Sequence, residues 1–341
     1  MKLGIIDYPT GKIGEGKAGV EETFEKLSRA KVDIYTPFFF ERNKPYWELI
    51  EPVMKQARKR GIAVHASVEC FCRWEHVGDA PERNYQLGTP ELIPERLKQL
   101  PEKESWRCPS WPENQDEVLR LIKRLANDYD FDGINLDFIR FCNSEILRRS
   151  PCVCAACRKA RLQYLGKEVL THDEILMPAF RAEMNGNEYL TFKSEKMYKE
   201  IQYRNKVITG VVRKARKLLK KDQALTVDGR ANYFRDAIFE GQDWAEWAKE
   251  GLVDMVRAMS YSTSFEYFSK AYVDEHVKIM GNNRARLCEI IGKGSSAGKL
   301  STAEMIRQIE YALAAGVETI YIFAMGSLEE SDIDALSEIK R

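Results

Sequence analysis

Short apolar stretches alternate with amphipathic stretches along the whole chain. The apolar stretches predict eight strands, at residues 3–6, 32–40, 63–68, 133–138, 224–227, 255–259, 286–291 and 319–323. Each is followed by apolar positions at helical spacing, which predict helices at residues 20–30, 46–60, 117–128, 189–221, 243–250, 267–280, 302–315 and 331–339. Asn114 or Asp116 is the expected cap of the third of these helices.

Regular alternation of strand and helix predicts a parallel sheet with right-handed crossovers. Eight such units in a single domain of residues 1–341 predict an α/β fold, the (β/α)8 TIM barrel. A doubly wound sheet is the alternative. No complete Walker-type Gly-x-x-x-x-Gly-Lys-Ser/Thr loop follows any predicted strand, which disfavours nucleotide binding, and no organic cofactor is predicted.

Two connections are unusually long. One follows the third strand, over residues 73–114, and the other follows the fourth, over residues 140–189. The second is rich in cysteine and is predicted to be a helical insertion between the fourth strand and its helix. Both connections are expected on the catalytic face of the barrel, where long loops are usually functional.

Charge and hydropathy exclude some partners. The 53 basic residues nearly balance the 52 acidic ones, so the composition predicts no nucleic-acid binding. No stretch of about 18 apolar residues occurs, so no membrane association is predicted. The polar residues near the start do not form the apolar core of a signal peptide, and cytoplasmic localisation is therefore expected. The oligomeric state stays open.

Carboxylates stand at or near the ends of five predicted strands. They are Asp7, Glu69, Asp137, Asp228 and Glu289. A buried carboxylate is costly without a partner or a task, and glycoside hydrolysis requires two carboxyl groups. We therefore predict Asp137 as a catalytic residue, with Asp228 or Glu289 as its partner and Glu69 in reserve. The alternative is structural: Asp137 pairs with Arg140 or Arg230, and the others pair with barrel arginines.

Other residues near the strand ends are candidates for substrate binding. Asp7, Arg140, Arg230 and Tyr261 are predicted to hold hydroxyl groups or to orient the carboxylates. Trp74 and Trp111 lie in or beside the first long connection and are predicted to stack on sugar rings.

Seven of the eight cysteines fall between Cys70 and Cys157. The motif Cys-x-Cys-x-x-Cys at Cys152, Cys154 and Cys157 offers three thiolates within six residues, enough to clasp part of a tetrahedral zinc site. Cys142 is predicted as the fourth ligand of a structural zinc ion. Cys70, Cys72 and Cys108 compete for that position, and free thiols or disulfides are the alternatives to metal.

Several segments together resemble the glycoside-hydrolase-like family 10 barrels. They are Asp-Gly-Ile-Asn-Leu-Asp-Phe-Ile-Arg-Phe at 132–141, Cys-Pro-Ser-Trp-Pro-Glu-Asn at 108–114, Gly-Gln-Asp-Trp-Ala-Glu-Trp at 241–247, Gly-Leu-Val-Asp-Met-Val at 251–256, Met-Ser-Tyr at 259–261 and His-Ala-Ser-Val at 65–68. The resemblance spans about residues 1–325. It implies a glycosidase-type barrel that acts on a carbohydrate, with Asp137 as the catalytic position that carries over.

A glycoside hydrolase acting on an oligo- or polysaccharide is therefore the predicted function. A carbohydrate-binding barrel without catalysis, and a sugar isomerase or metal-dependent hydrolase, are the alternatives. The chitinase family 18 motif has glutamic acid where this chain has Ile139, so the chitinase mechanism does not transfer.

Overall fold

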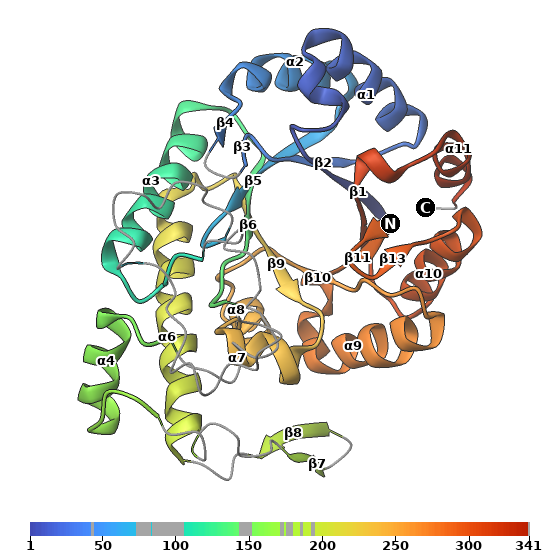
Figure 1. Cartoon of the computed structure of the whole chain (residues 1–341). Coiled ribbons are helices and arrows are strands. Elements are labelled where there is room, and N and C mark those ends of the chain that lie inside the picture. The colour runs from blue at the N-terminus through green and yellow to red at the C-terminus, as the bar shows by residue number, and fades with distance from the viewer. Residues whose placement is uncertain are drawn as a thin grey trace.

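The computed structural model describes residues 1–41, 44–72, 83, 106–142, 152–170, 174, 180–184, 187–191 and 195–339. Its centre is a closed barrel of eight parallel strands (Figure 1). They are β1 (Lys2–Asp7), β2 (Ile34–Pro37), β5 (Ala63–Glu69), β6 (Gly133–Asp137), β9 (Ala224–Arg230), β10 (Met255–Met259), β11 (Leu287–Gly292) and β14 (Thr319–Phe323). Around the barrel their order is β1-β14-β11-β10-β9-β6-β5-β2, which confirms the predicted (β/α)8 barrel.

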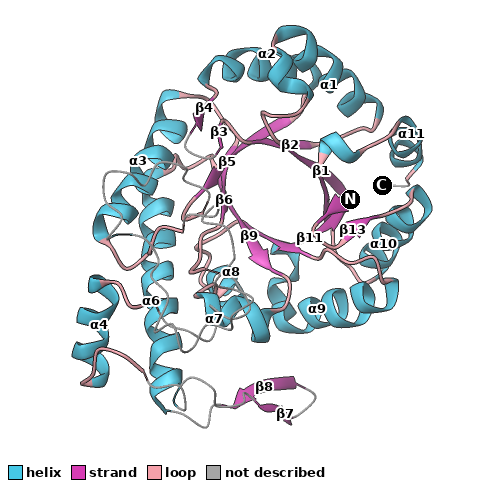
Figure 2. Ribbon diagram, viewed as in Figure 1, coloured by secondary structure: helices cyan, strands magenta, loops and turns pink. Residues whose placement is uncertain are grey.

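Helices surround the barrel (Figure 2). The main ones are α1 (Lys17–Arg29), α2 (Ile50–Arg60), α3 (Pro112–Asp128), α6 (Glu195–Leu218), α8 (Trp244–Lys249), α9 (Asp274–Met280), α10 (Thr302–Ala314) and α11 (Glu330–Glu338). Helix α3 begins earlier than predicted, with Trp111 as its extended cap residue and Pro112 in its first turn. Proline suits that position because its fixed φ is helical and its missing N–H is not needed there. Neither Asn114 nor Asp116 is the cap.

The connection after β6 holds additional elements. Helix α4 (Ala155–Leu165) packs against α6 outside the ring of helices (Figure 1). Strands β7 (Phe180–Met184) and β8 (Asn187–Thr191) form an antiparallel hairpin, so the predicted start of a helix at residue 189 is wrong. Short elements elsewhere are β3 (Phe40–Glu41), β4 (Lys44–Pro45), α7 (Ile238–Glu240), β12 (Gly294–Ser295) and β13 (Gly298–Lys299). Short 3₁₀ or π helices are Lys12–Glu15, Trp47–Leu49, Tyr233–Ala237, Tyr267–Val273, Gly281–Arg286 and Met325–Ser327.

Side chains on each strand alternate between the barrel interior and the layer under the helices, as the pleat requires. The interior apolar cluster comprises Ile6, Ile34, Phe38, Cys288, Ile290 and Tyr321. On β11, Leu287 and Ile291 belong instead to the large core between strands and helices. The parity of a position therefore decides whether its side chain faces the interior of the barrel.

Gly4 gives the first testable consequence of this packing. A Cβ atom at Gly4 would lie 2.3 Å from the ring of the buried Tyr321. Gly4→Ala is therefore expected to destabilise the protein by about 1–3 kcal/mol through overpacking. Gly210→Ala is the matched control, because nothing lies within 4 Å of a Cβ atom there and alanine favours the helix. Urea unfolding measures both, and equal stability of the two variants would contradict the packing argument.

Candidate active site

Three carboxylates lie in one row across neighbouring strands. Glu69 on β5 is the register partner of Asp137 on β6. Leu136 on β6 pairs with Val227 on β9, so the next position in that register pairs Asp137 with Asp228. The three side chains face inward and are nearly buried, with exposed fractions of 1% for Glu69, 6% for Asp137 and 3% for Asp228. The strands thus bring together three of the four carboxylates predicted to be catalytic, at the carboxyl-terminal end of the barrel.

Asp228 is held by an ion pair inside the barrel. Arg257 donates from Nε to Oδ1 at 2.6 Å and from Nη2 to Oδ2 at 2.9 Å. Asn135 Nδ2 also donates to Oδ2 at 2.9 Å. Both carboxylate oxygens therefore accept hydrogen bonds from buried donors. The alternative in which Asp228 pairs with a barrel arginine fits this geometry, and the arginine is Arg257.

Asp137 stands where β6 ends. Its Oδ1 accepts a hydrogen bond of 2.7 Å from the backbone N–H of Phe138, whose φ is +50°. Its carbonyl oxygen accepts one of 2.9 Å from the backbone N–H of Cys70, which follows Glu69. The backbone bond ties the end of β6 to the end of β5. It therefore fixes the spacing between Asp137 and Glu69.

Arg140 is buried beside Asp137. Its guanidinium lies 4.9 Å from the ring centre of Trp106 and 5.0 Å from that of Phe138. Its Nη1 is 3.2 Å from Oε2 of the fully buried Glu240. Burial and the charge of Arg230 lower the pKa of Arg140 below its ordinary value, although the negative charges of Glu240 and Asp137 offset part of this shift. Arg140 thus supplies a fixed positive charge next to the end of β6.

Arg230 also lies against Glu240, and its side chain is more exposed than that of Arg140. Its Nε lies 3.4 Å from Glu240 Oε2, and its Nη2 lies 3.3 Å from Asp236. The side chain is 26% exposed. Glu240 therefore joins the two predicted substrate-binding arginines. Sequence reasoning did not identify Glu240, because it lies beyond the strand end in the short helix α7.

Glu289 faces away from the barrel interior. Its neighbours in sequence, Cys288 and Ile290, point inward, so Glu289 points to the helix layer. There it is bonded to Ser260 and to Nδ1 of His276 on α9, the latter at 2.9 Å. Burial lowers the pKa of His276, but the Glu289 carboxylate, the Ala231 carbonyl and Glu275 together raise it more, so the net shift is upward. The structure does not bring Glu289 together with Asp137, because the strand parity directs it outward.

Asp7 also faces outward. It follows the inward-facing Ile6, and Oδ2 accepts a hydrogen bond of 2.7 Å from the hydroxyl of the buried Tyr35. The Tyr8 N–H donates to Oδ1 at 2.9 Å. Burial raises the pKa of Asp7 to about 7, although both hydrogen bonds lower it. This surrounding gives Asp7 structural partners and does not support the predicted contact with substrate.

The raised pKa of Asp7 has a consequence for stability. An acid with a higher pKa in the folded state favours folding at low pH, and this contribution is lost as pH rises from about 4 to about 7. Asparagine resembles the protonated acid, so the stability of Asp7→Asn relative to the wild type should increase over that interval. Urea unfolding at several pH values measures the difference. A difference that stays constant between pH 4 and pH 7 would contradict the argument.

Aromatic side chains line the barrel end beside these carboxylates. The rings of Tyr8 and Phe38 stack, with centroids 4.6 Å apart and an angle of 2° between planes. Phe323 lies edge-on to Tyr8 at 5.9 Å and 5.3 Å from Tyr261. Tyr8, Tyr261 and Phe323 are half-buried, and burial raises the pKa of Tyr261 well above its ordinary value. Tyr8 and Phe323 were not predicted as site residues, although both stand at strand ends.

Trp111 and Trp74, the two tryptophans predicted to stack on sugar rings, do not belong to the aromatic contacts described above. Trp111 is half-buried at the start of α3 and packs against the main core. Its backbone N–H donates to the carbonyl of Cys108 at 3.3 Å. Trp74 lies outside the described residues. The role of either residue in substrate binding stays a prediction.

Four cysteines converge beside this end of the barrel. The Sγ atoms of Cys108, Cys152, Cys154 and Cys157 all lie within 4.8 Å of one another. Hydrogen bonds from these thiols, that of Cys108 first, lower the pKa of Cys154 strongly. Cys142, the predicted fourth member, is buried but does not belong to this group, and Cys108 lies there instead. The sequence motif could not choose the fourth member because four cysteines competed for it.

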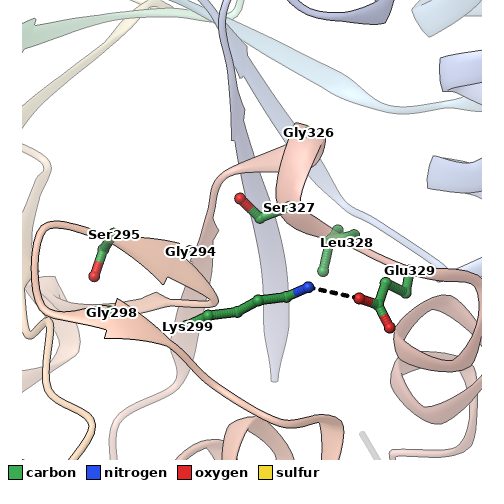
Figure 3. Close-up of a pocket in the computed structure, with 8 residues that line it drawn as sticks. All are labelled: Gly294, Ser295, Gly298, Lys299, Gly326, Ser327, Leu328 and Glu329. Atoms are coloured by element: carbon green, nitrogen blue, oxygen red, sulfur yellow. Dashed lines mark hydrogen bonds and ion pairs between the residues drawn. The ribbon is translucent and has the colours of Figure 1, made fainter.

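A depression of ≈ 390 Å³ lies between the segments that follow β11 and β14 (Figure 3). Gly294, Ser295 and Gly298 line one side, and Gly326, Ser327 and Leu328 line the other. Lys299 and Glu329 form an exposed ion pair of 2.7 Å across it. Because the pair is exposed and screened, it does not by itself define a binding site.

In the part of the chain that the structure describes, no helix has the length and apolar character needed to cross a bilayer.

Comparisons with known proteins give a likeness of fold. No family model and no curated protein matches the chain. The PgaB (BpsB) glycoside hydrolase domain from Bordetella bronchiseptica superposes with a TM-score of 0.65 and 13% identity, covering 99% of this chain and 98% of that one. α-L-Fucosidase isoenzyme 2 from Paenibacillus thiaminolyticus superposes with a TM-score of 0.62 and 14% identity, covering 99% of this chain and 48% of that one. The catalytic domain of β-amylase from Paenibacillus polymyxa superposes with a TM-score of 0.61 and 12% identity, covering 97% of this chain and 94% of that one.

Proposed function

We propose that this chain is a glycoside hydrolase that cleaves glycosidic bonds of an oligo- or polysaccharide. The observation that carries the proposal is the register pairing of Glu69 with Asp137 at the catalytic end of the barrel. The likeness of fold to a glycoside hydrolase domain, a fucosidase and a β-amylase supports it. So does the resemblance of residues 132–141 to glycoside-hydrolase-like family 10.

The surroundings of the two carboxyl groups suggest different roles. Asp137 lies beside the buried cation Arg140, which favours its ionised form. Glu69 is the register partner of Asp137 on β5 and is 1% exposed. Asp137 is therefore proposed as the nucleophile or base, and Glu69 as the proton donor. Asp228 is not assigned to the pair, because Arg257 engages both of its oxygens.

The spacing of the strands favours a retaining mechanism. Neighbouring strands lie about 4.7–4.9 Å apart, and retaining enzymes hold their carboxyl groups about 5–5.5 Å apart. Glu69 would donate its proton to the glycosidic oxygen while Asp137 attacks the anomeric carbon and the leaving saccharide departs. A water molecule would then give a proton to Glu69 while the water oxygen attacks the anomeric carbon. This attack breaks the bond between that carbon and Asp137 and releases the sugar.

The aromatic residues at the barrel end supply surface for the sugar. Tyr8, Tyr261 and Phe323 are each half-buried rather than buried. A sugar ring has an apolar face that packs on an aromatic ring, while its hydroxyl groups need donors and acceptors. The partly exposed side chain of Arg230 is the proposed partner for hydroxyl groups. The proposed substrate is therefore a carbohydrate that stacks on the aromatic rings and whose hydroxyl groups bind to Arg230.

The test is hydrolysis of a broad panel of glycans and aryl glycosides by the wild type. Proton NMR at early times identifies the anomer formed first, and retention of configuration is the expected result. Inversion would contradict the assignment of Asp137 as nucleophile. Binding of glycans without hydrolysis would overturn the proposal in favour of a non-catalytic carbohydrate-binding barrel.

A further inference from the structure

The four-cysteine group has the dimensions of a metal site. Its sulfur atoms lie within 4.8 Å of one another, and the Cys108 and Cys157 sulfurs are 3.4 Å apart. Zinc–sulfur bonds of about 2.3 Å in a tetrahedron place sulfur atoms about 3.8 Å apart. A disulfide would bring two sulfurs to about 2.05 Å, and none of the eight cysteines forms one.

The group is also buried and built from two distant segments. All four cysteines are at most 2% exposed. Cys108 precedes α3 on the connection after β5, whereas the other three open α4 on the connection after β6. Cys154 is the N-cap residue of α4, and Cys157 lies in the first turn of that helix. Among the described residues the group contains four sulfur atoms and no histidine or carboxylate, and such a closed set is typical of structural zinc.

The surrounding contacts hold the ligands in place. Cys157 Sγ and Ser110 Oγ are hydrogen-bonded at 3.1 Å. Arg161 on α4 donates from Nη2 to the carbonyl of Cys152 at 2.8 Å, and its Nε lies 3.1 Å from Glu200 on α6. Hydrogen bonds to the backbone and sulfur of metal ligands orient them and tune the metal. The cluster is therefore anchored to two helices of the outer layer.

We propose that Cys108, Cys152, Cys154 and Cys157 bind one structural Zn²⁺ ion that joins the two long connections of the catalytic face. Soft thiolate ligands in tetrahedral geometry favour Zn²⁺ over Mg²⁺, Ca²⁺ or Mn²⁺. Trp106, two residues before Cys108, packs against Arg140 and Phe138. The metal would thereby hold one wall of the candidate active site against the end of β6. The metal site is independent of the proposed hydrolysis, because it requires no activity.

Metal content of the full chain tests the proposal. Wild-type protein purified without chelator is expected to contain about one zinc ion per chain, as measured by inductively coupled plasma mass spectrometry. Cys108→Ala should reduce this at least about tenfold, whereas Cys142→Ala should keep it, because Cys142 lies outside the group. Zinc retained in Cys108→Ala and lost in Cys142→Ala would overturn the ligand set.

A second measurement uses the wild type alone, in case the variants fail to fold. Protein refolded with Co²⁺ in place of zinc is expected to show the thiolate-to-cobalt charge-transfer band and the visible bands of a tetrahedral site. Titration of the native protein with a mercurial should release zinc to a coloured chelator in step with thiol modification. Protein that contains no zinc and shows no thiolate-to-cobalt band would overturn the proposal, whatever its glycosidase activity.

Discussion

Asp137→Asn is expected to lower the rate of hydrolysis of any cleaved glycan by about 10²–10⁴-fold or more, because the amide can neither attack nor take a proton. The side chain of Asp137 faces the barrel interior and is 6% exposed, so the substitution keeps its volume and its hydrogen bond to Phe138. The kcat of the variant, measured on the best substrate from the panel, tests this. Unchanged kcat would remove Asp137 from the mechanism.

Asp132→Asn is the matched control for this loss. Asp132 precedes the same strand at its opposite end, where its carboxylate accepts a hydrogen bond of 2.7 Å from the backbone N–H of Val64. Residues at the amino-terminal end of a barrel serve stability rather than catalysis. The control should therefore unfold at a lower urea concentration and keep its kcat. Equal loss of activity in both variants would show that the effect of Asp137→Asn is not specific to the catalytic end.

The leaving group separates the roles of the two carboxyl groups. Glu69→Gln should lose most activity on natural glycosidic bonds and much less on aryl glycosides with an acidic phenol, which needs no proton to depart. Asp137→Asn should lose activity on both. A reversed pattern would exchange the two roles.

The strands were predictable because their apolar stretches are separated by helices of clear periodicity. Whether a strand side chain points into the barrel or toward the helices was predictable only where small or polar residues alternate with large apolar ones. On β6 the positions Gly133, Asn135 and Asp137 alternate with Ile134 and Leu136, and their inward direction could be inferred. Parallel strands that are buried on both faces otherwise form a continuous apolar run. Such a run does not show which of its side chains point into the barrel.

Glu289 and Asp7 illustrate that limit. Each is a single acidic residue in an apolar strand, and the sequence gives no neighbour that fixes its parity. Their partners, His276 and Tyr35, come from other elements of the fold. Cys108 raises a related difficulty, because a ligand from a distant connection has no fixed spacing from the Cys-x-Cys-x-x-Cys motif. Long-range pairing, rather than local pattern, decided these three positions.

Arg257→Met is expected to destabilise the fold by about 3–5 kcal/mol, because it leaves the Asp228 carboxylate buried without its cation. Arg257 is fully buried, donates twice to Asp228 and once to Thr36 Oγ1 at 3.0 Å, and lies 4.4 Å from the Tyr321 ring centre. Urea unfolding at pH 7 measures the loss. The matched control is Arg29→Met, whose exposed ion pairs with Glu330 and Asp334 should contribute about 0–1 kcal/mol.

A second substitution identifies the cause of this deficit. An ionised carboxylate that is buried without its cation costs free energy, whereas a neutral amide of similar volume costs much less. Adding Asp228→Asn to Arg257→Met should therefore recover part of the stability at pH 7 by removing the unpaired charge. A deficit that Asp228→Asn leaves unchanged would mean that Arg257 contributes through its packing against Tyr321 rather than through its charge.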